Sequence, residues 1–105
     1  MAATAFKFES DILSALAHPN RLRIVEGLRK GARCNCELMP ELGLEQSNLS
    51  RHARVLIDAG ILISWKDGVR VNYEVADKKI FDLVDSASAI AKRSLEQKLK
   101  ALKAG

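Results

Sequence analysis

Long apolar runs and targeting features are missing from this sequence. No stretch approaches the roughly 20 consecutive apolar residues that a helix needs to cross a bilayer. The first ten residues, MAATAFKFES, lack the basic start and the apolar centre of a secretory signal. We therefore expect a cytoplasmic protein with no membrane partner.

Cysteines, histidines and catalytic motifs are also scarce. The chain has two cysteines, Cys34 and Cys36, and two histidines, His18 and His52. It has no nucleophile–base pair, phosphate-binding loop or paired-acid arrangement, so we expect no enzyme activity and no required cofactor. In a reducing cytosol, two close cysteines are more often reactive or metal-binding than structural. The cysteine pair is therefore the first candidate site.

The bulk composition indicates one small, basic domain. The 105 residues are 48% hydrophobic and 29% charged, without internal repeats or long linkers, so residues 1–105 should form a single domain. A domain of this size buries only about two-thirds of its unfolded surface, and self-association would add burial. The net charge of +4 suits a phosphate backbone without proving that one is bound.

The apolar pattern predicts helices, one hairpin and a long final helix. Helical spacing dominates both ends of the chain, while β-branched and aromatic residues flank Asp67-Gly68, a strong hairpin signal. The expected elements are helices at about 8–18, 20–30, 37–42 and 47–59, strands at about 61–66 and 69–75, and a helix from about 77. Pro40 should lie in a first turn or at a kink, and Gly43 should end the third helix. The fold class is mainly α with a β-hairpin (α+β).

The helix predicted at 47–59 has an apolar side and a polar side. Two helices joined by a tight turn, the second with exposed polar side chains, form a helix-turn-helix whose second helix enters the major groove. Glutamine and asparagine can pair with adenine, arginine with guanine, and hydroxyls with bases or phosphates. The candidate DNA-binding residues here are Gln46, Ser47, Asn48, Ser50, Arg51, His52 and Arg54. The plain alternatives are a solvated helix face and, for His52, a structural histidine.

A hairpin directly after this helix would act as a wing. Its tip carries Lys66 and Arg70, placed to contact phosphates or a minor groove. With a two-residue type I′ turn at Asp67-Gly68, Trp65 and Arg70 would face each other and form a cation–π contact. A packed aromatic is the plain alternative for Trp65.

Three segments resemble one family of repressors. QSNLSRHARVLIDAGIL resembles the recognition helix of ArsR/SmtB-type winged-helix repressors, with its S-x-x-S-R-H-x-x-x-L pattern. AHPNRLRIVEGL resembles that family's second-helix opening, and GVRVNYEV resembles its wing, with the aromatic at Tyr73. The resemblance covers roughly residues 10–90. It implies a winged helix-turn-helix repressor of transcription on double-stranded operator DNA, dimerised as a homodimer through its first and last helices.

The cysteine segment RCNCEL also resembles a family element, C-x-C-[DE]-L in the third helix. The arsenic-, antimony-, cadmium- or lead-sensing members respond through it, so the resemblance implies that Cys34 and Cys36 bind As(III), Sb(III) or a soft divalent metal as inducer. Side chains at i and i+2 of a regular helix point apart, so both sulfurs can hold one ion only in an extended segment or at an unwound helix start. Arg33 and the nearby helix N-terminus should favour the thiolates.

The chain departs from the metal-sensing members in three places. Met39 stands where arsenic sensors typically have a third cysteine, the N-terminal segment has no cysteine, and the final-helix histidine ligands of zinc and nickel sensors are missing. Three alternatives therefore stay open for the pair: redox or reactive-sulfur sensing, an inducer-free DNA-binding regulator, and a merely structural role. A metal-buffering protein without specific DNA affinity is disfavoured by the wing and the polar helix face.

Overall fold

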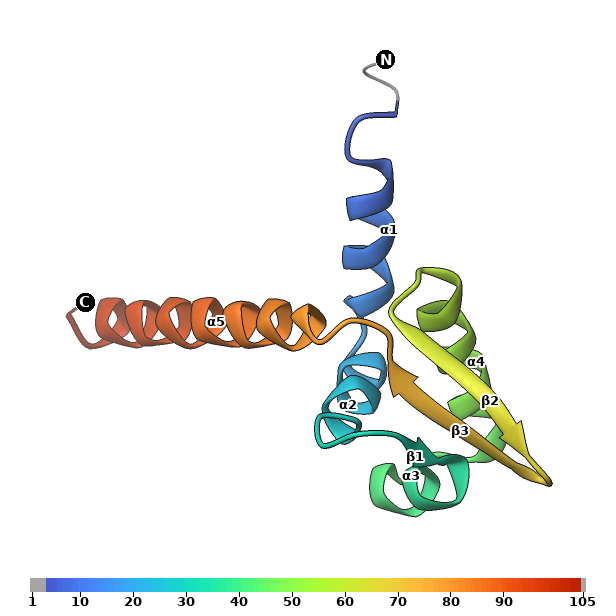
Figure 1. Ribbon diagram of the computed structural model, residues 1–105. Helices are drawn as coiled ribbons and strands as arrows, with labels where there is room; N and C mark the ends of the chain where they lie inside the picture. The colour runs from blue at the N-terminus through green and yellow to red at the C-terminus, as the bar shows by residue number, and fades with distance from the viewer. Residues whose placement is uncertain (1–3, 105) are drawn as a thin grey trace.

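A computed structural model describes residues 4–104. Its elements follow in the order α1 (Lys7–Leu16), α2 (Pro19–Gly27), β1 (Arg33–Cys34), α3 (Asn35–Leu42), α4 (Gln46–Asp58), β2 (Leu62–Asp67), β3 (Arg70–Val75) and α5 (Lys79–Ala104). Figure 1 shows α2, α3, α4 and the strands as the body, from which α1 and α5 extend in different directions. This is the mainly helical, winged helix-turn-helix arrangement that the sequence predicts.

The core of the body is aliphatic and includes one whole side of α4. Leu49 and Leu56 have no exposed surface, and Ala53 between them is 1% exposed. They belong to one cluster with buried side chains of the other elements, such as Leu38 of α3. Burying each leucine contributes about 1.5–3 kcal/mol. Because this packing fixes the apolar side of α4 inward, the polar side of the helix faces outward.

The strands form an antiparallel sheet in the order β1-β3-β2. β1 has only two residues, and no hydrophobic pattern predicts it. Its Cys34 pairs with Asn72 of β3, so the first cysteine lies beside the inner strand of the wing. The sheet thereby connects the cysteine segment to the hairpin.

The expected position of the hairpin turn is wrong by one residue, which shifts the pairing of the two strands by two residues. Trp65 lies opposite Asn72, and Asp67 lies opposite Arg70, so the two-residue turn is Gly68-Val69. Gly68 has a φ of 64°, which costs little only without a Cβ. A type II′ turn puts this glycine first and spares Asp67 the left-handed conformation that a type I′ turn requires. Trp65 and Arg70 are therefore not paired, and the expected cation–π contact between them does not form.

Four helices differ from the prediction by two or more residues at one end. α1 stops at Leu16 rather than near residue 18, and α5 begins at Lys79 rather than near residue 77. α2 stops at Gly27 rather than near residue 30, and α3 begins two residues before the expected start. Pro40 therefore lies inside α3 instead of in its first turn, and the carbonyl of Cys36 receives no helical hydrogen bond from residue 40, because proline has no N–H. Gly43 ends α3 with a φ of 65°, as predicted.

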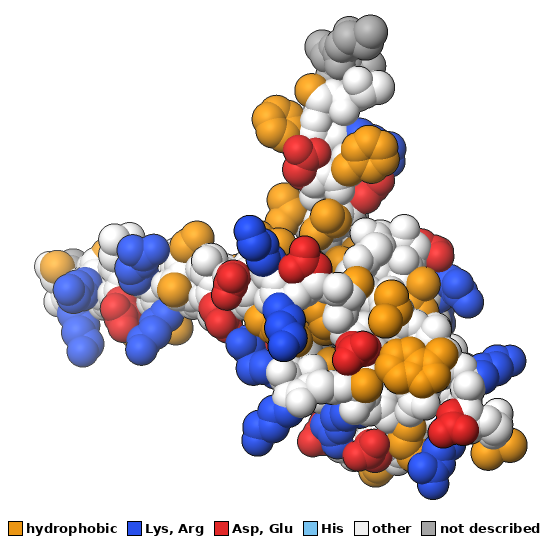
Figure 2. All heavy atoms as spheres, viewed as in Figure 1, with side chains coloured by type: hydrophobic (Ala, Val, Ile, Leu, Met, Phe, Trp, Pro, Cys, Tyr) orange, Lys and Arg blue, Asp and Glu red, His pale blue; other side chains and the backbone are white. Residues whose placement is uncertain are grey.

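The two helices that extend from the body expose large apolar side chains. They are Phe8, Leu13, Leu83, Ile90, Leu95, Leu99 and Leu102, and Figure 2 shows hydrophobic side chains along both helices. The Cα radius of gyration is 16.5 Å, larger than the roughly 13 Å of a compact chain of this length. None of the helices within residues 4–104 combines the length and the apolarity needed to cross a membrane.

Candidate nucleic-acid interface and dicysteine site

The outward side of α4 carries polar and cationic side chains. The exposed ones are Gln46, Ser47, Ser50, Arg51 and Arg54, and Asn48 is half-buried. The Arg51 guanidinium donates to Asn48 Oδ1 at 2.8 Å. Arg54 lies 3.8 Å from Asp58, and both side chains are 69% exposed, so this ion pair is weak and can be exchanged for a phosphate.

The wing adds two more cations near the same face. Lys66 and Arg70 are exposed close to the turn. A groove between α4 and the wing is lined by residues of both elements, including Ser50, Arg54 and Lys66. Figure 1 shows α4 beside β2, with the hairpin turn projecting away from the body. The helix and the wing thus present cations around one groove.

His52 is not part of this surface. Its side chain is 8% exposed, its ring centroid lies 4.5 Å from that of His18, and its Nδ1 lies 3.4 Å from Arg21 Nη1. Burial, and then electrostatic repulsion by His18, Arg21 and Arg51, hold the pKa of His52 below its ordinary value of 6.5. The expectation of a DNA contact from His52 is therefore wrong, and the residue connects α4 to the start of α2 as a mainly neutral imidazole.

Tyr73 of β3 joins the wing to α4. It is 4% exposed, and it lines the groove between α4 and the wing together with Ser50 and Arg54 of α4. Burial raises the pKa of Tyr73 above its ordinary value of 10.0, while the neighbouring Ser50 hydroxyl and the charge of Arg54 oppose the rise. The wing is thus packed against α4 through a buried aromatic side chain.

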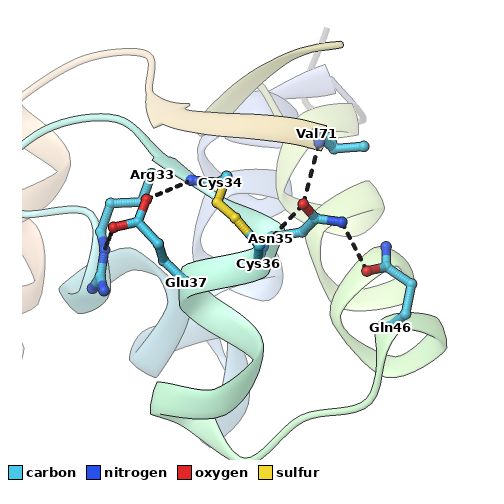
Figure 3. The surroundings of a disulfide bond; sticks show 7 residues. All are labelled: Arg33, Cys34, Asn35, Cys36, Glu37, Gln46 and Val71. Atoms are coloured by element: carbon cyan, nitrogen blue, oxygen red, sulfur yellow. Dashed lines mark hydrogen bonds and ion pairs between the residues drawn. A yellow bond between two sulfur atoms is a disulfide. The ribbon is translucent and has the colours of Figure 1, made fainter. Parts of the chain in front are cut away.

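Cys34 and Cys36 are joined by a disulfide (Figure 3). Cys34 ends β1 in an extended conformation at the N-cap of α3, and Cys36 lies in the first turn of that helix. Their Cα atoms are 5.2 Å apart. The pair therefore occupies the unwound helix start that the i, i+2 spacing requires for both sulfurs to meet. Cys34 is buried, whereas Cys36 is exposed.

Arg33, expected to favour the thiolates, is paired with carboxylates instead. Its Nη1 lies 2.5 Å from Glu41 Oε2, and its Nε lies 3.9 Å from Glu37 Oε2. Glu37 also accepts a hydrogen bond from the N–H of Cys34 at 3.3 Å. Because two carboxylates compensate the guanidinium, the N-terminus of α3 is the main positive group left beside the sulfurs.

The described residues supply no third metal ligand to the pair. Within residues 4–104, no group of three or more His, Cys, Asp or Glu side chains is arranged to hold a metal ion. Met39, which stands where arsenic sensors typically have a third cysteine, has a half-buried, neutral thioether side chain. Once reduced, Cys34 and Cys36 fit a thiophilic ion only as a two-sulfur site, with any further ligand coming from solvent or a small thiol.

Asn35, between the two cysteines, connects three elements (Figure 3). Its Oδ1 accepts hydrogen bonds from the N–H groups of Cys36 at 2.9 Å and Val71 at 3.2 Å. Its Nδ2 donates to Gln46 Oε1 at 2.9 Å, and Gln46 Nε2 donates to Ser50 Oγ at 3.0 Å. One amide thus links α3, β3 and α4. No motif or spacing in the sequence predicts this role for Asn35.

Comparison with protein families and with relatives identifies regulators. The family described as "Bacterial regulatory protein, arsR family" matches residues 18–64. The HTH-type transcriptional regulator Rv0081 of Mycobacterium tuberculosis is 35% identical over 98 residues, which cover 92% of this chain and 86% of that protein. A probable mercury resistance operon repressor of Streptomyces lividans is 34% identical over 77 residues, 73% of this chain but only 62% of that repressor.

Solved structures agree in fold. The crystal structure of Rv0081 matches with a TM-score of 0.78, covering 90% of this chain and 95% of that one. The solution structure of a homodimeric winged helix-turn-helix DNA-binding domain from Mycobacterium bovis also has a TM-score of 0.78, covering 91% of this chain and 89% of that one. That domain is 23% identical to this chain, so it supports the fold alone.

Proposed function

Because the chain belongs to the arsR family of bacterial regulatory proteins, we propose that it is a homodimeric repressor of transcription that binds double-stranded operator DNA and is released through Cys34 and Cys36. Its relatives are transcriptional regulators and not enzymes. We propose that the protein acts in the cytoplasm and that residues 1–105 form a single winged helix-turn-helix domain.

The observation that carries the DNA-binding half is the groove between α4 and the wing. Cations of two separate elements, Arg54 and Lys66, line it, while Arg51 and Arg70 are exposed on the same two elements. Guanidinium and ammonium groups neutralise phosphates, and the polar residues at the start of α4 are of the types that read base edges. The proposed DNA-binding residues are Gln46, Ser47, Asn48, Ser50, Arg51, Arg54, Lys66 and Arg70.

The homodimer is supported by the apolar surface of α1 and α5. Leu95 and Ile90 are each 58% exposed in the single chain, and monomers rarely leave a long apolar stripe in water. A two-fold axis through these helices would place two copies of α4 on successive major grooves of a pseudo-palindromic site.

For the inducer, we propose a thiophilic metalloid or metal ion bound by the reduced cysteine pair. Arsenite, antimonite, cadmium, lead and mercuric ions share a preference for soft thiolate ligands. The Streptomyces relative carries the name of a mercury resistance repressor. The helix start that holds both cysteines contacts α4 through Asn35, so a change there can bias the DNA-binding surface.

A second candidate is a redox or reactive-sulfur sensor that uses the same pair. Two observations favour it: the sulfurs form a disulfide, and no third ligand for an ion stands beside them within residues 4–104. In this version oxidation itself, without a metal, would release the operator. An inducer-free regulator would show neither response.

One titration separates these possibilities. A duplex selected from a random-sequence library by repeated rounds of protein binding is labelled with fluorescein, and its affinity is measured by anisotropy. The protein is tested reduced, then with arsenite, cadmium, mercuric ion or zinc, and then after peroxide. Cys34→Ser and Cys36→Ser remove the sulfurs, and Met39→Leu is the matched control because it removes the neighbouring thioether.

The proposed metal sensor loses duplex affinity with the thiophilic ions and keeps it in both serine variants, whereas Met39→Leu behaves as the wild type. A redox sensor loses affinity with peroxide instead. If both serine variants respond as the wild type does, the sensing half fails and the DNA-binding half stands. If no duplex is enriched at low salt, the DNA-binding half fails.

A further inference from the structure

Each end of the Gln46 amide has one hydrogen-bond partner within the protein. Gln46 Oε1 accepts from Asn35 Nδ2 at 2.9 Å, and Gln46 Nε2 donates to Ser50 Oγ at 3.0 Å. A glutamine that reads adenine uses the same two atoms, one as acceptor and one as donor. While it keeps both internal partners, Gln46 holds its amide between Asn35 and Ser50 instead of turning it toward a base edge, although its side chain is exposed at the start of α4.

We infer that Asn35 is a positioning residue which, while the Cys34–Cys36 disulfide is closed, holds Gln46 in a conformation that cannot read DNA. This inference rests on the proposed DNA-binding function and on its redox version. Asn35 acts through Gln46 and need not contact DNA itself. Opening the disulfide would release Gln46 and tighten operator binding.

The disulfide closes a covalent ring that includes the backbone of Asn35. Its two ends are the residues before and after Asn35, with Cα atoms 5.2 Å apart. Within this ring the side-chain Oδ1 is held by the N–H groups of Cys36 and Val71, which leaves Nδ2 directed at Gln46 (Figure 3). Opening the ring restores rotation about the backbone bonds of residues 34–36.

A dithiol reductant supplies the chemical change. Its two thiols give two electrons and two protons to the Sγ atoms of Cys34 and Cys36, the S–S bond breaks, and the dithiol becomes a disulfide. Oxidation by a diazene such as diamide reverses the change: the two thiols lose two electrons and two protons, and the diazene becomes a hydrazine. The redox state of the pair thus determines whether Asn35 is held against Gln46.

The size of the effect follows from the contact that is lost. A bidentate side-chain contact to one base changes affinity by about 5- to 150-fold. The disulfide form should therefore bind the selected duplex more weakly than the reduced form by a factor in this range for each half-site. It should also lose its preference at the one base pair that Gln46 reads.

The test uses three variants and both redox states. Asn35→Leu keeps a side chain of similar size but removes both hydrogen-bonding ends, and Gln46→Ala removes the residue that Asn35 positions. Asn20→Leu is the matched control, since Asn20 lies in the first turn of α2 and its Oδ1 accepts from Arg23 at 3.1 Å. Duplex affinity is measured by anisotropy with dithiothreitol and after diamide, and circular dichroism checks folding.

The second measurement is the preference for one base pair, which would not change with redox state if Asn35 had only a structural role. The base pair read by Gln46 is identified as the one whose substitution lowers the duplex affinity of wild type but not that of Gln46→Ala. Oxidised wild type should resemble Gln46→Ala at this base pair. Asn35→Leu should keep the preference in both redox states, and its ratio of oxidised to reduced dissociation constants should fall to about one. Asn20→Leu should keep the wild-type ratio.

Each contrary outcome has one meaning. A redox ratio that persists in Asn35→Leu overturns the role of Asn35 and leaves the proposed function standing. If Asn35→Leu does not fold, Gln46→Ala decides, because its ratio should also be about one, and a persistent ratio there overturns the inference. If wild type binds duplex equally in both states, redox control itself fails, and the inference fails with it.

Discussion

Replacing Arg70 with alanine should lower the salt dependence of DNA binding without altering the fold. Arg70 is exposed at the first position of β3, next to a turn residue, Val69, that is 98% exposed. In the proposed complex its side chain would therefore reach a phosphate beside the DNA groove that receives α4. Removing it takes away one cation and disturbs little packing.

The magnitude follows from counting exposed cations on the proposed surface. Arg51, Arg54, Lys66 and Arg70 provide four in each protomer, and a dimer would have twice as many. If each neutralises one phosphate, the slope of log affinity against log salt is about −7, and Arg70→Ala reduces it to about −5.4. Raising salt from about 50 to about 200 mM would then weaken wild type by about four orders of magnitude and the variant by about three.

The assay is anisotropy of a labelled selected duplex at five potassium chloride concentrations. Lys30→Ala is the matched control, because Lys30 is also an exposed cation but lies in the turn after α2, beside Glu74 and Val75 at the end of β3 opposite to Arg70. Its slope should equal that of wild type. An unchanged slope in Arg70→Ala, or an equal loss in Lys30→Ala, would refute the placement of phosphates along the wing.

Three further predictions concern assembly and stability. The double substitution Leu95→Glu and Leu99→Glu should make the protein monomeric in sedimentation and weaken duplex binding. These two leucines are 58% and 49% exposed in the single chain. Unchanged sedimentation would contradict a dimer through α5. Because the folded-state pKa of His52 is lowered, the unfolded state binds the proton more tightly, and stability present above about pH 6.5 should fall as the pH drops below it. Urea unfolding at several pH values should show this loss, and His52→Leu should flatten it. Gly43→Ala should cost about 1–2 kcal/mol, because its φ of 65° is strained for an L side chain; an unchanged urea midpoint would count against this.

Local signals in the sequence were sufficient for most of the elements. α4 spans Gln46–Asp58 where 47–59 was predicted, and Asp77 accepts a hydrogen bond from the N–H of Lys79 at 2.9 Å, as expected of a residue that begins the final helix. Helical periodicity, caps and turn residues act over a few neighbouring positions, so the sequence alone displays them. The same periodicity correctly assigned the apolar and the polar sides of α4.

The side chains near the limits of these patterns could not be assigned in this way. His52 lies at the edge of the apolar side of α4, and only the packing of α2 against α4, which brings His18 and Arg21 beside it, buries it. The position of the hairpin turn likewise depended on which residue could adopt a positive φ at lower cost. Gly68 adopts it, so the turn is shifted by one residue from the expected position.

The sequence by itself determined that two cysteines stand two residues apart at the start of a helix, before a polar helix and a hairpin. Only the tertiary structure decided that the sulfurs meet, because pairing of Cys34 with Asn72 draws the first cysteine into an extended strand. It also decided that Asn35 reaches Gln46, eleven positions away. Such contacts come from the burial of apolar faces on different elements, a nonlocal effect that local spacing does not contain.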